Sequence, residues 1–322
     1  MVITSTLRKE IEYHMHCPTS CQYALLALTA MLTAAIASHA ANPGDKPTDP
    51  SLLFASKNLT AWCVVPFDAN KRGPEERAAM LQKLGFKNFA YDWRAKDIPA
   101  FDEEVDAMKR HGVKITAWWF PTDPNDPVAR TILEVCKRHD IHPQLWVMGG
   151  GSEVKTPEEQ AQRVDQEADR IARIVELARP FGCAVELYNH NNWFGQTDNE
   201  IAIIERLKQK GVTGVGMVYN FSHGHWDIDD FAAKWARMKP YVVAVNVSGM
   251  VKSEALIPPG QGDHELDMLR VIQQSGWKGP IGLIAEQGGD AEVTLSNGLA
   301  GLKWLGKELA RPGSGGERPK VK

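Results

Sequence analysis

Residues 241–248 read YVVAVNVS, an apolar run of strand length that turns polar at its end. Valine dominates the run, and β-branched residues favour strands. Because successive side chains of a strand point to opposite faces, the large odd-numbered residues from Tyr241 to Val247 share one face. The other face becomes polar at Asn246 and Ser248. This pattern predicts a buried strand whose far end carries functional groups.

Similar runs occur at seven other places, and they predict strands at 59–67, 88–93, 113–120, 143–148, 183–189, 212–220 and 280–286. Helical patterns follow the strands, and we expect helices at 74–85, 101–112, 156–182, 198–211, 228–240, 265–276 and 291–310. The helix at 156–182 has Thr156 as its expected N-cap and Gly182 as its stop.

Eight strand-like runs that alternate with helical patterns predict an α/β protein with a (β/α)8 TIM barrel as its single domain, over residues 59–310. The alternative is an open doubly wound sheet, which normally has a glycine-rich phosphate turn after its first strand. Here the segment after the first predicted strand, DANKRGPEE, has one glycine. The barrel is therefore favoured.

Polar side chains follow the last four predicted strands on the faces that we expect to point inward. Glu186, Tyr188 and His190 are spaced by two, so they share one face, and Glu186 is the deepest. Because the active sites of such barrels lie at the carboxyl ends of the strands, these groups should meet at the open mouth. The candidate catalytic residues are Glu186, His190, His223 and Glu286.

A second set of residues at or just past strand ends is expected to bind substrate. It contains tryptophans, whose faces stack on the apolar faces of sugars, together with polar side chains. Its members are Arg94, Trp93, Trp118, Tyr188, Trp193, Asn220, His225 and Asn246. Packing is the alternative for each aromatic residue, and a structural ion pair with Arg94 or a buried lysine is the alternative for Glu186.

Several stretches of the second half resemble the xylose isomerase-like barrel superfamily, the sugar phosphate isomerases/epimerases. They are LYNHNNWFGQ (187–196), VGMVYNFSHGH (215–225), MKPYVVAVNVSGM (238–250), PPGQGDHELDMLRVIQQSGWKGPIGLI (258–284) and DAEVTLSNGLAGLKWL (290–305). As a group they are similar to a branch found in exported bacterial proteins. The resemblance implies proton abstraction next to a carbonyl, which isomerises or epimerises sugars.

The resemblance also implies one divalent metal, Mn, Mg, Co or Zn, held by Glu, Asp, His and Glu at the ends of strands five to eight. Here Tyr188, Asn220, Asn246 and Ile284 occupy these positions, although His223 keeps the Asp-x-x-His spacing. An amide oxygen is a weaker ligand than a carboxylate. A rebuilt site would use Glu186, His190, His223 and Glu286, and no nucleotide cofactor is expected.

Three functions remain open. The first is an isomerase or epimerase for a non-phosphorylated sugar or keto-sugar. The second is a lyase or hydratase for 3-keto-glycosides, which shares the first chemical step. The third is a non-catalytic carbohydrate-binding barrel, which the substituted ligand positions favour. A repair nuclease, known among distant barrel relatives, needs a metal cluster and a basic groove, and the net charge of -3 gives no sign of nucleic-acid binding.

The ends of the chain differ from the barrel. Residues 24–37 form an uncharged apolar run followed by Ser-His-Ala, which predicts a signal peptide at 1–40, with an uncleaved membrane anchor as the alternative. We therefore expect a periplasmic or extracellular protein without stable membrane insertion after cleavage, acting on a small carbohydrate. Residues 41–58 read as a linker and 311–322 as a disordered tail.

Overall fold

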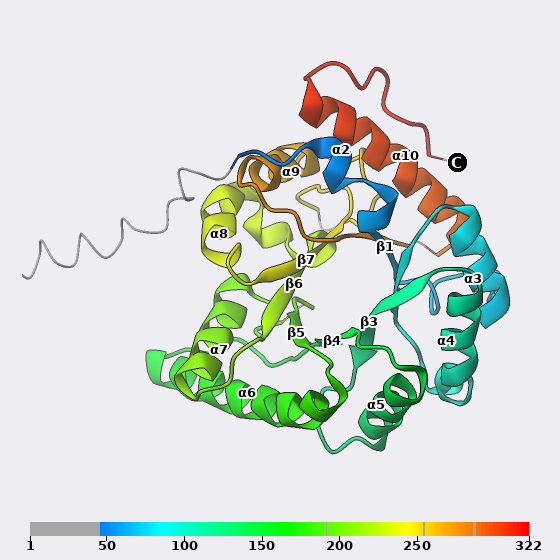
Figure 1. Ribbon diagram of the computed structural model, residues 1–322. Coiled ribbons are helices and arrows are strands. Elements are labelled where there is room, and N and C mark those ends of the chain that lie inside the picture. Colours follow the sequence, from blue (N-terminus) through cyan, green and yellow to red (C-terminus); the bar gives the residue numbers. More distant parts are fainter. Residues whose placement is uncertain (1–45, 191, 254, 286–287, 322) are drawn as a thin grey trace, which may run out of the picture. The chain divides into compact units, whose positions relative to one another are not determined.

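The computed structural model describes residues 46–190, 192–253, 255–285 and 288–321. Eight parallel strands close into a barrel in chain order, and helices surround it (Figure 1). The strands are β1 (Leu59–Trp62), β2 (Asn88–Tyr91), β3 (Lys114–Phe120), β4 (Gln144–Val147), β5 (Val185–Tyr188), β6 (Gly216–Asn220), β7 (Val242–Val247) and β8 (Ile281–Ile284). The predicted (β/α)8 TIM barrel is therefore confirmed.

The surrounding helices are α3 (Pro74–Lys83), α4 (Phe101–Arg110), α5 (Pro127–His139), α6 (Pro157–Ala178), α7 (Thr197–Gln209), α8 (Phe231–Met238), α9 (Glu265–Gln274) and α10 (Ala291–Ala310). Short 3-10 helices are η1 (Ser56–Asn58), η2 (Ala95–Ala100), η3 (Arg179–Phe181), η4 (Phe221–His223) and η5 (His225–Asp230). The Thr156 side chain caps α6, as predicted, and Gly182 ends η3 with a φ of 68°.

Two layers of side chains fill the molecule. The barrel interior contains Trp62, Cys63, Ala90, Ala117, Trp146, Tyr188, Val218, Ala244 and Ile284. The larger layer packs between the strands and the helices, and the strand side chains predicted to face outward, such as Leu187, Met217 and Leu283, belong to it. The predicted alternation is thus confirmed for most of the strand positions.

The alternation fails at two register shifts. Between β6 and β7, Met217 pairs with Val242 but Val218 pairs with Ala244, so Val243 is an extra residue. As a result Val242 packs in the outer layer and Val243 against the interior, the reverse of the prediction. A second shift between β2 and β3 makes Thr116 the extra residue. Such bulges shift the facing of neighbouring side chains.

The segments before and after the barrel are more ordered than the sequence suggests. Within the expected linker, α2 (Pro50–Leu53) buries Leu53 in the outer layer, and Figure 1 shows α2 beside α10. The expected disordered tail folds back, because Nε1 of Trp304 donates to Gly316 O at 3.1 Å and Nε2 of Gln261 donates to Pro319 O at 2.7 Å. These hydrogen bonds hold the tail against the barrel. The expected signal peptide lies outside the described residues.

Candidate active site at the barrel mouth

Two histidines meet where β5 and β6 end. His190 follows β5 by two residues, and His223 closes η4, which begins directly after β6. Their ring centroids are 4.5 Å apart, and both side chains are half-buried. The predicted convergence of these two candidates at the mouth is therefore seen in the structure.

The phenol of Tyr188 lies beside this pair and ties three strands together. Its oxygen accepts hydrogen bonds from Nε1 of Trp62 at 2.9 Å and from Nδ2 of Asn220 at 2.5 Å. The amide of Asn220 has a defined orientation, because its Oδ1 accepts from the backbone N–H of Ser222 at 3.1 Å. The Tyr188 ring stacks on Trp146, with centroids 5.6 Å apart. Tyr188 is thus fixed by packing and by two buried N–H donors.

Both histidines are held in their neutral form. Burial, together with the neighbouring His190 and His225, lowers the pKa of His223 to about 3. Burial also lowers the pKa of His190 below its usual value. A neutral imidazole has one nitrogen that accepts and one that donates, so the pair can both receive a proton and donate a hydrogen bond.

A pocket of about 480 Å³ opens next to His190 on the side of β2 to β4. It is lined by Trp93, Arg94, Ala95, Trp119, Phe120, Pro121, Thr122, Asp123, Asp126, Met148 and His190. The Trp119 ring contacts both the Tyr188 ring, at 5.0 Å between centroids, and the His190 ring, at 6.2 Å. The pocket and the histidine pair therefore share a wall. The predicted binding residues Trp93 and Arg94 lie in this pocket.

Trp118 does not reach the mouth, which corrects the prediction. It is fully buried between the barrel and the helices, where its ring contacts Tyr91 at 4.9 Å and Phe101 at 5.2 Å. The extra residue Thr116 turns Trp118 outward and Trp119 inward. Trp119, rather than Trp118, lines the pocket at the mouth. The small residue Ala117, two positions before Trp119, is the sequence signal that indicates the inward face.

Trp193 and His225 are also buried. Nε1 of Trp193 donates to Oε1 of Gln160 on α6 at 2.8 Å, and the side chain is 1% exposed. Trp193 therefore packs the loop after β5 rather than binding substrate. His225 begins η5 and is 9% exposed, close enough to His223 to affect its pKa. His225 is not among the residues that line the mouth pocket.

Glu186 lies below the mouth. It is two residues before Tyr188 on the same face, which places it roughly 7 Å deeper along the strand. Its register partner on β4 is Trp146, whose ring stacks on Tyr188 above it. Oε2 of Glu186 accepts from the backbone N–H of Gly216 at 2.7 Å, and a Cβ at Gly216 would lie 2.6 Å from that oxygen. The structure thus separates Glu186 from His190.

The carboxyl of Glu186 has no ion-pair partner within the described residues. Arg94, the partner considered from the sequence, donates from Nη1 to the carbonyl oxygens of Asp92 and Trp93 at the mouth. Burial raises the pKa of Glu186 to about 8, against the smaller effect of the Gly216 hydrogen bond. The carboxyl is therefore largely protonated at neutral pH, and an ion pair does not explain its burial.

Asn246 lies in the floor of the barrel rather than at its mouth. It lines a cavity of about 220 Å³ together with Thr60 and Gln144. A Cβ at Gly282 would lie 1.7 Å from its Oδ1, so the glycine makes room for the amide. Within the described residues, neither amide atom of Asn246 has a hydrogen-bond partner. A polar cavity of this kind suits bound water.

The donor set expected for a divalent metal is not assembled in the described part of the chain. Glu186 lies deep in the barrel, and Glu286 falls outside the described residues. Across the described ranges, no three His, Cys, Asp or Glu side chains come together in a way that fits a metal ion. The groups at the expected ligand positions are a phenol bound by two N–H donors, two amides and the buried Ile284. These residues do not fit the expected metal.

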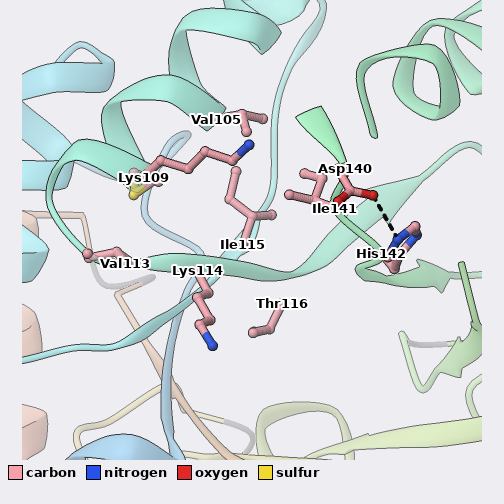
Figure 2. A pocket seen from close by; sticks show the side chains of 11 residues that line it. Val105, Lys109, Val113, Lys114, Ile115, Thr116, Asp140, Ile141 and His142 are labelled. Atoms are coloured by element: carbon pink, nitrogen blue, oxygen red, sulfur yellow. Dashed lines mark ion pairs between the residues drawn. The ribbon is translucent and has the colours of Figure 1, made fainter. Parts of the chain in front are cut away.

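A second pocket, of about 580 Å³, lies at the opposite end of the barrel. Figure 2 shows the side chains that line it. It is formed where α4 ends and β3 begins, and its rim carries Asp140 and His142, whose side chains are 3.5 Å apart. The active sites of this fold lie at the carboxyl ends of the strands, whereas this pocket lies at their amino ends. Its position at the amino ends of the strands therefore argues against a catalytic role for this pocket.

The (β/α)8 barrel and the polar side chains at its mouth are typical of one class of protein. A family model described as the xylose isomerase-like TIM barrel matches residues 78–305. The chain belongs to this family. No curated protein matches the sequence.

Solved structures show the same fold at low identity. A 3-keto-D-glucoside 4-epimerase from E. coli has a TM-score of 0.57 and 15% identity, covering 77% of this chain and 98% of its own. A zinc-bound IolI protein has a TM-score of 0.56 and 15% identity, covering 78% and 99%. A probable 3-DHS dehydratase from Bacillus anthracis has a TM-score of 0.58 and 13% identity, covering 75% and 97%. Among the described residues, no helix is long and apolar enough to span a membrane.

Proposed function

We propose that this protein is an enzyme that removes a proton next to the carbonyl group of a non-phosphorylated sugar or keto-sugar, as an isomerase or epimerase does. The observation that carries the proposal is the His190–His223 pair, with ring centroids 4.5 Å apart, beside an aromatic pocket at the barrel mouth. The family supports it, since similar folds include a 3-keto-D-glucoside 4-epimerase and a D-psicose 3-epimerase.

The two histidines have different roles in the proposed step. His190 lines the pocket, so it takes the proton from the carbon next to the carbonyl group. His223 donates its N–H to the carbonyl oxygen, on which negative charge develops as the C–H bond breaks. For isomerisation, the proton held by His190 is delivered to the former carbonyl carbon, while the hydroxyl proton of the neighbouring carbon moves to the former carbonyl oxygen. For epimerisation, water protonates the opposite face of the enolate, and the proton on His190 passes to solvent. Both roles require neutral imidazoles before the reaction, and burial holds both in that form.

Tyr188 fixes the geometry of this pair. Its ring centroid is 6.4 Å from that of His190 and 6.1 Å from that of His223. The hydrogen bonds from Trp62 and Asn220 prevent its ring from turning. A rigid group beside the reacting atoms holds the catalytic side chains in place without movement during the reaction.

The substrate is proposed to be uncharged. The mouth pocket has Arg94 on its wall but also Asp123 and Asp126, which disfavour a phosphate group. The proposed export of the chain also disfavours a phosphorylated substrate, because phosphosugars are mostly cytoplasmic. The predicted signal peptide at 1–40 supports this part of the proposal and needs its own test.

Hydrogen–deuterium exchange tests the proposed chemistry whichever product is formed. The protein is incubated in D2O with D-psicose, D-tagatose, D-fructose and 3-keto-glucosides, and the carbon-bound hydrogen next to the carbonyl is followed by NMR. We expect exchange with at least one of these sugars. His190→Asn should slow it by about a hundredfold or more, since general base catalysis contributes that much.

The matched control is His142→Asn. His142 has a 56% exposed side chain at the opposite end of the barrel, so exchange should be unchanged. No exchange with any of the sugars, or equal rates for His190→Asn and the wild type, would remove the proposal. The NMR spectra of the products then distinguish isomerisation, epimerisation and elimination.

A further inference from the structure

The pocket beside His190 is larger than the reaction at the histidine pair requires. His190 is its one lining residue from the pair. Its remaining walls come from the end of β3 and from the segments after β2, β3 and β4. A volume of about 480 Å³ falls in the range of pockets that bury a ligand larger than one small ring. A sugar held between His190 and His223 would leave most of this space open.

The pocket walls are rigid aromatic surfaces. Nε1 of Trp93 donates to Trp119 O at 2.7 Å, and the Trp93 ring packs edge-on against Phe101, with centroids 5.4 Å apart. The Trp119 ring packs against Trp62 at 5.5 Å and Tyr188 at 5.0 Å. Side chains that are already fixed lose little entropy when a ligand binds. Such walls suit a ring with an apolar face.

The rim of the pocket carries charges of both signs. Arg94 is held there by hydrogen bonds from Nη1 to the carbonyl oxygens of Asp92 and Trp93, at 2.7 and 2.9 Å. Asp123 and Asp126 also line the pocket, and each accepts a hydrogen bond from a nearby backbone N–H. A mixed rim offers donors and acceptors to hydroxyl groups, whereas it does not favour an anion or a cation.

We infer that this pocket binds a second, uncharged ring, so that the substrate is a glycoside whose sugar is joined to another sugar or to an aromatic group. The inference rests on the proposed function, in which His190 acts on the sugar ring at one end of the pocket. The second ring lies against Trp93 and Trp119, and its polar substituents face Arg94, Asp123 and Asp126.

Calorimetric binding to matched glucosides tests the inference. The probes are methyl β-D-glucoside, phenyl β-D-glucoside and cellobiose, which share one sugar and differ in the second group. We expect at least one of the two probes with a second ring to bind about five- to tenfold more tightly than the methyl glucoside, as a stacked ring contributes. Preference for cellobiose identifies a second sugar, and preference for the phenyl glucoside identifies an aromatic group.

Two variants test whether the pocket causes the tighter binding of the probes with a second ring, which we call the gain. Trp93→Ala should abolish the gain, so that the three probes bind with similar affinity. Because Trp93 also packs against Phe101, a second variant is needed in case the first does not fold. Ala95→Phe fills the pocket from an exposed position without removing a contact, and it should abolish the gain as well.

The matched control is Trp226→Ala, which removes a 45% exposed tryptophan from η5, outside the pocket, and should keep the gain. Equal affinity for the three probes, no binding of either ring-bearing probe, or equal loss in Trp226→Ala would each overturn the inference. Ring-dependent binding without hydrogen–deuterium exchange would contradict the proposed function alone. Exchange on single sugars without ring preference would contradict the inference alone.

Discussion

The hydroxyl oxygen of Tyr188 and Nδ2 of Asn220 are 2.5 Å apart at the top of the barrel, and both side chains are buried. The phenol occupies the place at which the sequence resemblance implies a metal-binding glutamate. It accepts a second hydrogen bond from Nε1 of Trp62. A neutral network of phenol, amide and indole thus replaces a charged ligand position next to the histidine pair.

Tyr188→Phe should lower both stability and activity. The change leaves two buried N–H groups, of Trp62 and Asn220, without an acceptor, and each such group costs about 1–3 kcal/mol. We expect a loss of at least about 2 kcal/mol in the free energy of unfolding, measured by urea denaturation. Tyr241→Phe is the control, because Tyr241 donates to Glu205 near the surface and its loss should cost less than about 1 kcal/mol. Equal costs in the two variants would contradict the network.

Glu186→Gln should retain activity. Glu186 lies below Tyr188 and Trp146, and its carboxyl is largely protonated at neutral pH, so the amide resembles it in shape and charge. Deuterium exchange into the sugar should remain within about threefold of the wild type, in contrast to His190→Asn. A hundredfold loss with an intact fold would show that Glu186 reaches the reacting atoms and would restore the role expected from the sequence.

Removal of divalent metals should leave deuterium exchange within about twofold. The prediction follows from the donor chemistry of Tyr188, Asn220 and Asn246, which are neutral where the family's metal ligands are expected. The measurement is the exchange rate after dialysis against EDTA, with the metal content of the sample determined in parallel. Loss of exchange that returns with Mn²⁺ would contradict this and would point to Glu286 as a ligand alongside the histidines.

Glu200→Gln should reduce the loss of folding stability that occurs as the pH rises. Glu200 is fully buried, and burial together with Asp227 raises its pKa well above the usual value. A carboxyl whose folded-state pKa is raised contributes stability below its unfolded pKa, about 4.3, and this contribution is lost as the pH rises toward the folded value. As the pH rises above about 4.3, the free energy of unfolding of the wild type should therefore fall relative to that of the variant by up to about 1.4 kcal/mol per pH unit. This corresponds to roughly 2–4 °C in Tm per pH unit.

Glu205→Gln on the same helix is the control for that experiment. Glu205 is half-exposed, and its hydrogen bonds from Lys208 and Tyr241 lower its pKa. Its contribution to stability therefore increases as the pH rises, opposite to that of Glu200. Thermal unfolding of the three proteins between pH 5 and 8, followed by circular dichroism, gives the comparison. Parallel Tm curves for the wild type and Glu200→Gln would show that the Glu200 carboxyl does not titrate differently in the folded state.

Export should yield a mature chain that begins at Ala41. The apolar run at 24–37 and Ser-His-Ala at 38–40 predict cleavage after Ala40. Mass spectrometry of the N-terminus after expression in a bacterium, with separation of periplasm and membranes, measures this directly. A replacement of Ala40 by a bulky residue is the control and should block processing. A full-length chain retained in the membrane fraction would favour the uncleaved anchor.

The sequence determined the barrel and most of its inward faces, because both follow from local patterns. Strand runs alternate with helical runs, and the period of two places Tyr188, Val218, Ala244 and Ile284 on one side of their strands. The meeting of His190 and His223 could be inferred in the same way, since each follows the end of a neighbouring strand. These inferences do not depend on which residue pairs with which across the sheet.

The tertiary structure alone decided how deep in the barrel each inward side chain lies. It also decided where the alternation of inward and outward side chains along a strand reverses. Asn220 pairs with Asn246, and Asn246 with Gly282, yet Asn220 holds Tyr188 near the mouth while Asn246 lines the floor cavity. The reason is that strands in a closed barrel are tilted and staggered, so neighbours in the sheet differ in depth. The extra residue Thr116 likewise turns Trp119, rather than Trp118, inward. Pairing between strands distant in sequence sets both features.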